Sequence, residues 1–220
     1  MPRRVRATRV IPALLLAVSL AACHGSGGGS SPVAEASSPG LVAQPGYPTG
    51  STAAVASEDP VAPENNPPGD IPDNLAFVTY HNATGKYSIS HPEGWAETAN
   101  GSTVTFTDKL NSVHVEVGKL TSAPAVASVR RGDVRSLQNS QPAFELRSVT
   151  PFKVGGAEGV KIVYRRNSAP DSVTGRQYRD EVERYLLVKR GRELIIELSG
   201  PVGADNVDAY HQMLSDLAFA

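Results

Sequence analysis

An alternation of apolar and polar residues with a period of two constrains the fold of this chain more than any other feature. In residues 87–91 and 103–108 large side chains alternate with serine or threonine, and in 113–117 valines alternate with His114 and Glu116. A period of two directs successive side chains to opposite faces, so each segment predicts a half-buried strand. Further strands are predicted over 143–149, 160–166, 177–189 and 192–199.

The last two predicted strands are separated by Arg190 and Gly191, which predict a tight hairpin. Residues 185–188 are all apolar, so the alternation does not fix which face of this strand is buried. A strand that is apolar on both sides is typical of the middle of a sheet with helices on its faces.

Two segments have the apolar spacing of amphipathic helices. Residues 125–139 carry such a pattern, interrupted by Gly132, and the C-terminal pattern is clearer, with Asp205 near its start, where a carboxylate favours the helix dipole. The two apolar stripes are Val126, Val129, Val134 and Leu137, and then Val207, Tyr210, Leu214 and Leu217. Strands and helices in mixed order predict an α+β fold, with a central antiparallel β-sheet flanked by helices.

The first 23 residues have the pattern of a bacterial lipoprotein signal peptide. Four arginines precede an apolar run over 10–22, which is shorter than the ~20 residues that span a bilayer. The run ends in Leu20-Ala21-Ala22-Cys23, which resembles the lipobox, in which the cysteine thiolate accepts the lipid. The alternative is a chance cysteine after an ordinary signal peptide. It is disfavoured because Cys23 is the only cysteine in the chain.

We therefore expect residues 1–22 to be removed as a signal peptide and Cys23 to become the lipid attachment site. Palmitate and related acyl chains on Cys23 would hold the protein at the extracytoplasmic face of a cell membrane, since two or more chains anchor stably. The membrane is thus the first expected partner, reached through lipid alone.

Residues 23–74 have the composition of a lipidated N-terminus and disordered tether. A Gly/Ser run over 25–31 leads into a segment rich in Ala, Ser, Pro and Gly, with too few large apolar groups to offset the ordering entropy. The glycine run is not a phosphate-binding loop, because the Gly-Lys-Ser/Thr that follows a strand in such loops is absent. Residues 75–220 then form a single globular domain of ordinary size.

The charge balance disfavours nucleic acid as a partner. Four of the 21 basic residues and none of the 22 acidic ones lie in residues 1–22, so the processed chain carries 17 basic and 22 acidic side chains, a net charge of −5. Nucleic-acid binding and a polybasic grip on anionic lipid both need a basic surface, which this total does not suggest.

The motif over Tyr87–Trp95, which ends in Pro92-Glu93-Gly94-Trp95, resembles the opening of PsbP-like domains. A second strand over 103–108 and two long strands before a C-terminal helix are also similar to that family, so the resemblance covers about 75–220. It implies an α/β/α sandwich with an antiparallel sheet between helices, the fold of PsbP and the Mog proteins. It also implies a role in binding or organising protein complexes, without a photosynthetic assignment.

Catalytic motifs are absent from the sequence: it has no Gly-x-Ser-x-Gly, no His-Glu-x-x-His and no paired cysteines. His114 and Glu116 share one strand face, and His81 or His91 could complete a metal site with them. Because spacing fixes no third ligand, we favour a polar face in water, and we expect neither a metal nor a cofactor.

Other candidate residues also have a structural and a functional interpretation. Trp95 is a candidate for stacking on a ligand, but its place after Pro92 and Gly94 favours a role in the core. The pair Arg130-Arg131 suits either an anionic partner or a solvated helix face. Four glutamates of the last two strands could supply acid/base chemistry, or they could form cross-strand charge pairs on an exposed face with nearby arginines. We favour the charge pairs. The residues are Glu181, Glu183, Glu193 and Glu197, beside Arg165, Arg166 and Arg184.

These observations predict a membrane-anchored cell-envelope lipoprotein. We expect its soluble domain to be a non-enzymatic module that binds a protein partner in the envelope. A small-ligand or metal-binding lipoprotein is the alternative. A deep pocket lined by Trp95 would favour that alternative, whereas a domain with one apolar or charged surface patch would favour the protein-binding module.

Overall fold

The computed structural model describes residues 58–65 and 68–220. By its contacts the chain divides into Met1–Val42 and Ala43–Ala220, and every described residue belongs to the second unit. The predicted signal peptide, Cys23 and the predicted tether as far as residue 57 lie outside the described residues. None of the helices among the described residues is long and apolar enough to cross a membrane.

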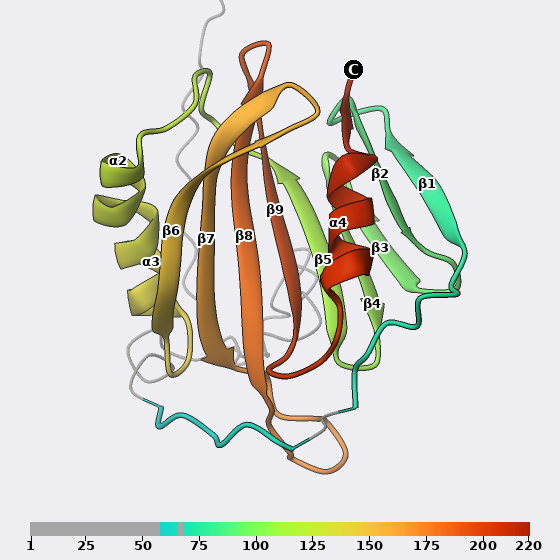
Figure 1. The fold of residues 1–220 in the computed structure, drawn as a ribbon, viewed down its shortest axis with the longest axis vertical. Coiled ribbons are helices and arrows are strands. Elements are labelled where there is room, and N and C mark those ends of the chain that lie inside the picture. Colours follow the sequence, from blue (N-terminus) through green and yellow to red (C-terminus); the bar gives the residue numbers. More distant parts are fainter. Residues whose placement is uncertain (1–57, 66–67) are drawn as a thin grey trace, which may run out of the picture. The chain divides into compact units, whose positions relative to one another are not determined.

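A seven-stranded antiparallel sheet forms the centre of the domain (Figure 1), with strand order β3-β4-β5-β9-β8-β7-β6. Its strands are β3 (Ala96–Asn100), β4 (Thr103–Asp108), β5 (Asn111–Val117), β6 (Glu145–Val154), β7 (Ala157–Asn167), β8 (Arg179–Lys189) and β9 (Arg192–Pro201). The hairpin predicted between the last two is confirmed, because Lys189 pairs with Arg192 across Arg190 and Gly191. Both turn residues have positive φ, +52° and +74°, which matches the right-handed twist of the strands.

A second, three-stranded sheet consists of β1 (Phe77–Asn82), β2 (Tyr87–Pro92) and β10 (Ala218–Phe219). The central strand, β2, has the period-two pattern and was predicted, whereas β1, β10 and β3 of the large sheet were not. All five residues of β3 are exposed, so this edge strand has no buried face that would leave an apolar alternation in the sequence.

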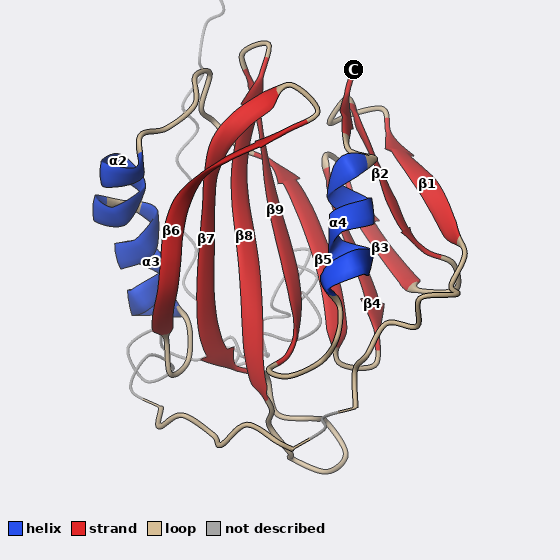
Figure 2. Cartoon of the chain, viewed as in Figure 1, coloured by secondary structure: helices blue, strands red, loops and turns tan. Residues whose placement is uncertain are grey.

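Among the described residues, three short helices accompany the sheets (Figure 2): α2 (Val126–Arg131), α3 (Asp133–Ser140) and α4 (Val207–Ser215). The single helix predicted over 125–139 is two helices, broken at Gly132, whose backbone angles of −99° and −83° are not helical. The described domain is therefore mostly antiparallel strand, and the expectation of an α/β/α sandwich fits only in part.

The large sheet has a hydrophobic core on each face. One core contains Trp95, Phe106 and Met213 and lies between the sheet, α4 and the small sheet; the other contains Val129 and Leu137 and lies under α2 and α3. Apolar residues of β8 enter both cores, since Tyr185 and Leu187 belong to the first core and Val182 and Leu186 to the second. The prediction that this strand is covered on both faces is confirmed.

The described residues before 75 lie against the domain, which corrects the predicted tether boundary at residue 74. We call residues 58–65 and 68–74 the strap; it runs along the lower end of the sheet in Figure 1. Ile71 is only 5% exposed, and its backbone N–H donates to Asn206 Oδ1 at 2.8 Å. Asn111 Nδ2 donates to the Gly69 carbonyl at 2.7 Å. Ile71 and contacts from Asn111, Asn167 and Asn206 bind a segment that composition alone suggests is disordered.

Candidate functional site

A polar cleft of about 350 Å³ lies between α3 and the strands β4, β5, β8 and β9. Nine of its ten lining residues are polar, and Leu137 is the exception. It contains both members of the predicted metal pair, His114 and Glu116, together with Arg184 and Glu197 from the two long strands.

The strand alternation explains why these side chains meet. Val113 and Val115 point into the first core, so His114 and Glu116 between and beyond them point to the opposite face. The register pairs Glu197 of β9 with His114 on one side and with Arg184 of β8 on the other. Three adjacent strands therefore bring an imidazole, a carboxylate and a guanidinium into one row.

These groups form a connected network. Glu197 accepts hydrogen bonds from Arg184 Nη1 and, at 3.4 Å, from the Tyr164 hydroxyl. Arg184 Nη2 lies 3.7 Å from Glu116 Oε1, so one guanidinium is placed between two carboxylates. On the neighbouring strand His114 Nδ1 is 2.8 Å from Thr105 Oγ1. The cleft is thus already cross-linked by its own side chains.

Burial determines the charge state of the network. It lowers the pKa of the His114 imidazole, against the opposing effect of Glu197 and Glu116, so the ring is neutral at neutral pH. Burial acts to raise the pKa of Glu197, but Arg184 and Arg166 together outweigh it and the pKa is lowered, so the carboxylate stays ionised. The network thus combines an ionised Glu197 with a neutral imidazole.

The cleft presents hydrogen-bonding and charged groups in a fixed arrangement. Thr105 and His114 form a hydroxyl–imidazole pair, but in the described part of the chain no carboxylate hydrogen-bonds to the other ring nitrogen, as a catalytic triad requires. Arg184 Nε is buried and has no hydrogen-bond acceptor. An unpaired buried donor costs about 1–3 kcal/mol, so an incoming oxygen atom would be bound favourably there.

The two histidines that were considered as further ligands lie on the other side of the sheet. His91 stacks on Phe106, with 3.9 Å between ring centroids, on the face of the first core, and His81 is an exposed residue of β1. Neither approaches His114. Within residues 58–65 and 68–220 no three His, Asp, Glu or Cys side chains are grouped closely enough to hold a metal ion.

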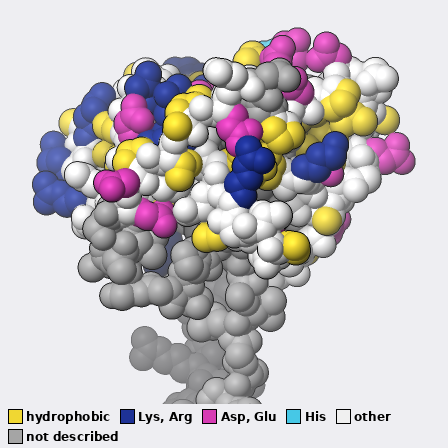
Figure 3. Space-filling view, turned by 90° about the horizontal axis from the view of Figure 1, so that it is seen from below, with side chains coloured by type: hydrophobic (Ala, Val, Ile, Leu, Met, Phe, Trp, Pro, Cys, Tyr) yellow, Lys and Arg dark blue, Asp and Glu magenta, His cyan; other side chains and the backbone are white. Residues whose placement is uncertain are grey.

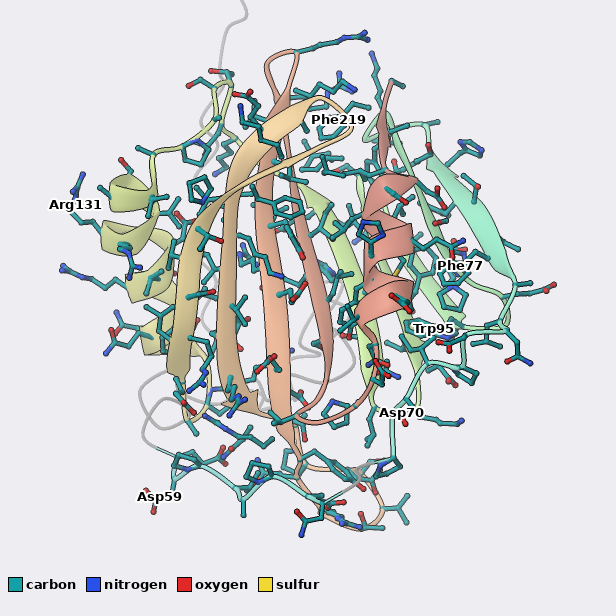
Figure 4. All side chains as sticks on the ribbon, viewed as in Figure 1. Asp59, Asp70, Phe77, Trp95, Arg131 and Phe219 are labelled. Carbon is teal, nitrogen blue, oxygen red and sulfur yellow. The ribbon has the colours of Figure 1, made fainter. Side chains whose placement is uncertain are left out.

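Trp95 does not line the cleft. It is 7% exposed and belongs to the first core, with Phe106 and Met213. Figure 4 shows Trp95 on the side of the domain that holds α4 and the small sheet. The tryptophan therefore fills the space between the sheet and its cover, which is the structural interpretation favoured by its position after Pro92 and Gly94.

The four glutamates of β8 and β9 divide between two environments. Glu181 pairs with Arg165 at 2.9 Å and Glu183 with Lys161 at 2.5 Å, as expected for cross-strand charge pairs. The expectation of an exposed face is wrong for Glu193 and Glu197, which are 3% and 9% exposed. The alternation along β9 turns both side chains to the opposite face of the sheet. There Glu193 accepts hydrogen bonds from the backbone N–H groups of residues 119 and 120.

Sequence reasoning missed the partners that complete the cleft: Thr105, Tyr164 and the α3 residue Ser136. For Thr105, the polar residues at alternate positions of β4 and β5 were a usable signal. The contribution of α3 depends on how the helix packs across the sheet, and no local pattern encodes that.

No family model matches this chain, and no curated protein sequence matches it. Solved structures do: cyanobacterial PsbP from Synechocystis matches with TM-score 0.47 and 16% identity over 70% of this chain and 100% of that one. The Ran-binding protein Mog1p from Saccharomyces cerevisiae matches with TM-score 0.45 and 8% identity, over 66% of this chain and 96% of that one. LpqN from Mycobacterium tuberculosis, described as involved in cell envelope biogenesis, matches with TM-score 0.40 and 13% identity, over 67% of this chain and 92% of that one.

The chain spans 48% of the length of a further match, a protein from Bacteroides thetaiotaomicron. Because all of these TM-scores are below 0.5, the family assignment stays the resemblance carried by residues 87–95.

Proposed function

We propose that this chain is a membrane-anchored cell-envelope lipoprotein whose folded domain is a non-enzymatic protein-binding or accessory module. The observation that carries the proposal for the domain is the state of the polar cleft. Its charged groups already pair with one another, and its imidazole is neutral and lacks a carboxylate partner. Such a cleft offers a specific, polar contact surface without an activated nucleophile.

The proposed anchor is Cys23, through a diacylglyceryl group and palmitate. The test is phase partition in detergent. The wild type should enter the detergent phase, and Cys23→Ser should remain aqueous, because it has no thiolate to accept the lipid. If both chains stay aqueous, the lipoprotein assignment is wrong.

The proposed partner contact is tested by crosslinking in cells. A photoreactive amino acid at Ser136, on the rim of the cleft, should give a discrete adduct with an envelope protein. The matched control places it at Thr98, an exposed residue of the edge strand β3. Equal adducts from both positions, or none from Ser136, would contradict a partner at the cleft.

A second candidate function is binding of a small polar ligand. It is favoured by the buried Arg184 Nε, which has no acceptor and would bind a ligand oxygen. The same crosslinking distinguishes the two candidates, because a small ligand would leave Ser136 without a protein adduct while protecting the cleft from chemical modification.

A further inference from the structure

The outer surface of the helix pair α2–α3 carries three arginines that no core or cleft contact uses. Val129, Val134 and Leu137 point into the second core, whereas Arg130, Arg131 and Arg135 are exposed; we call these three the basic surface. Figure 3 shows Lys and Arg side chains gathered on the side of the domain where α2 and α3 lie in Figure 1, and Figure 4 shows Arg131 pointing outward from it.

The positive charge of this surface is not neutralised by neighbours. None of the three arginines forms an ion pair within the described residues, and Asp133 is the single acidic residue of the two helices. The nearby Arg147 is different, because Glu145 pairs with it at 2.6 Å. The basic surface therefore projects a local positive potential from a processed chain whose net charge is −5.

Helix stability does not explain all three residues. Arg130 and Arg131 lie in the last turn of α2, where cations interact favourably with the helix dipole. Arg135 lies in the first turn of α3, where a positive charge is unfavourable. An exposed charge that the helix dipole disfavours suits an external, anionic partner.

We propose that the basic surface docks onto anionic lipid headgroups of the membrane that carries the anchor. This inference rests on the proposed lipoprotein function, because an anchored domain is always beside a bilayer. The start of the described chain supports it. The Asp59 carbonyl accepts from Asn167 Nδ2 at 2.8 Å, and Asn167 donates its own backbone N–H to the Pro142 carbonyl at 3.0 Å, two residues beyond α3.

The strap therefore begins close to the C-terminal end of α3, at the lower left of Figure 1, on the side of the domain that carries the basic surface. Docking of this surface would orient the domain. Its acidic remainder would face away from the anionic headgroups, and the polar cleft, which α3 also borders, would lie close to the bilayer and to any partner in the same membrane.

The test is sedimentation with vesicles, using residues 24–220. This chain keeps every described residue and lacks Cys23, so its outcome does not depend on lipidation. At low ionic strength it should bind vesicles of phosphatidylglycerol and phosphatidylcholine, and bind pure phosphatidylcholine weakly. Arg130→Gln/Arg131→Gln/Arg135→Gln should weaken binding to the anionic vesicles roughly 10- to 100-fold, since each basic side chain near an anionic surface contributes to attraction.

The matched control removes the same number of charges elsewhere, as Lys86→Gln/Lys109→Gln/Lys119→Gln, three exposed lysines outside the helices. It should bind the anionic vesicles nearly as well as the wild type. Both variants should unfold at the wild-type temperature, since all six side chains are exposed. Equal loss in the two triple variants, or no preference of the wild type for anionic vesicles, would overturn the proposal.

Discussion

Arg184 and Glu197 are the residues on which the polar cleft depends. Their side chains are 17% and 11% exposed, and the pair links β8 to β9 on this face of the sheet. Breaking a buried ion pair is costly because the remaining charge is left without compensation. The pair Arg165–Glu181, on the opposite face and more exposed, offers a direct comparison.

We expect Arg184→Met to lower the free energy of unfolding by about 3 kcal/mol, because Glu197 remains buried and loses its main partner. The double variant Arg184→Met/Glu197→Leu should recover most of this loss. Arg165→Met should cost less than about 1 kcal/mol, since its partner is largely solvated. Denaturant unfolding measures all three, and equal losses from Arg184→Met and Arg165→Met would contradict the assignment of a buried pair.

Asp180 makes the stability of the domain pH-dependent. Burial raises the pKa of its carboxyl to about 6, against the opposing effect of Arg166 and Arg179. The folded state therefore binds the proton more tightly than the unfolded chain. The stabilisation is fully present below the ordinary pKa of 3.8 and is lost as the pH rises through about 6.

Relative to Asp180→Asn, the wild type should thus lose about 2 kcal/mol of stability as the pH is raised from about 4 to about 7. The difference in unfolding free energy between the two chains at any one pH also includes the loss of the Asp180 charge beside Arg166. The change of that difference with pH is therefore the informative quantity. Chemical denaturation across this pH range measures it. Parallel stability curves would show that Asp180 titrates normally.

At the scale of elements, α4 shows how an apolar stripe and a buried face differ. Leu214 and Leu217 are buried as their spacing suggests, and Met213, outside the stripe, is completely buried. Val207 belongs to the predicted stripe but is 72% exposed. A periodic pattern identifies the helix, and its docking position decides which stripe residues are covered.

Leu214→Asp should therefore destabilise the domain by several kcal/mol, since it places an unpaired carboxylate in the first core. Val207→Asp should leave stability unchanged or slightly raised, because a carboxylate in the first turn of a helix is favourable. Thermal unfolding of the two variants, followed by circular dichroism, checks both. A large loss with Val207→Asp would mean that the whole stripe is buried.

At the scale of the whole molecule, the strap makes the folded unit longer than its composition suggests. Ile71 is buried against the first core, and polar atoms of Asn111, Asn167 and Asn206 are bonded to strap backbone. These asparagines would lose those partners if the chain began at residue 75.

A chain of residues 75–220 should be less stable than one of residues 58–220 by about 3 kcal/mol, from the lost burial of Ile71 and the unpaired asparagine groups. Ile71→Ala in the longer chain should reproduce a large part of this loss. Denaturant unfolding of the three chains measures the difference. If 75–220 and 58–220 unfold identically, the strap does not contribute to the fold.

The sequence by itself determined the positions of most strands, the final hairpin and the C-terminal helix, because period-two and helical spacing are local consequences of burying one face. It also determined the two faces of β5, and so the common direction of His114 and Glu116. The resemblance over residues 87–95 and the lipobox ending at Cys23 are likewise features of sequence alone.

Only the tertiary structure decided what meets on each face. Strand register placed Arg184 and Glu197 beside His114, and the fold put His81 and His91 on the far side of the sheet. It also bound the strap through one isoleucine and a few asparagines. The physical reason is that register, helix docking and strap binding depend on contacts between residues far apart in the chain, which local spacing does not encode.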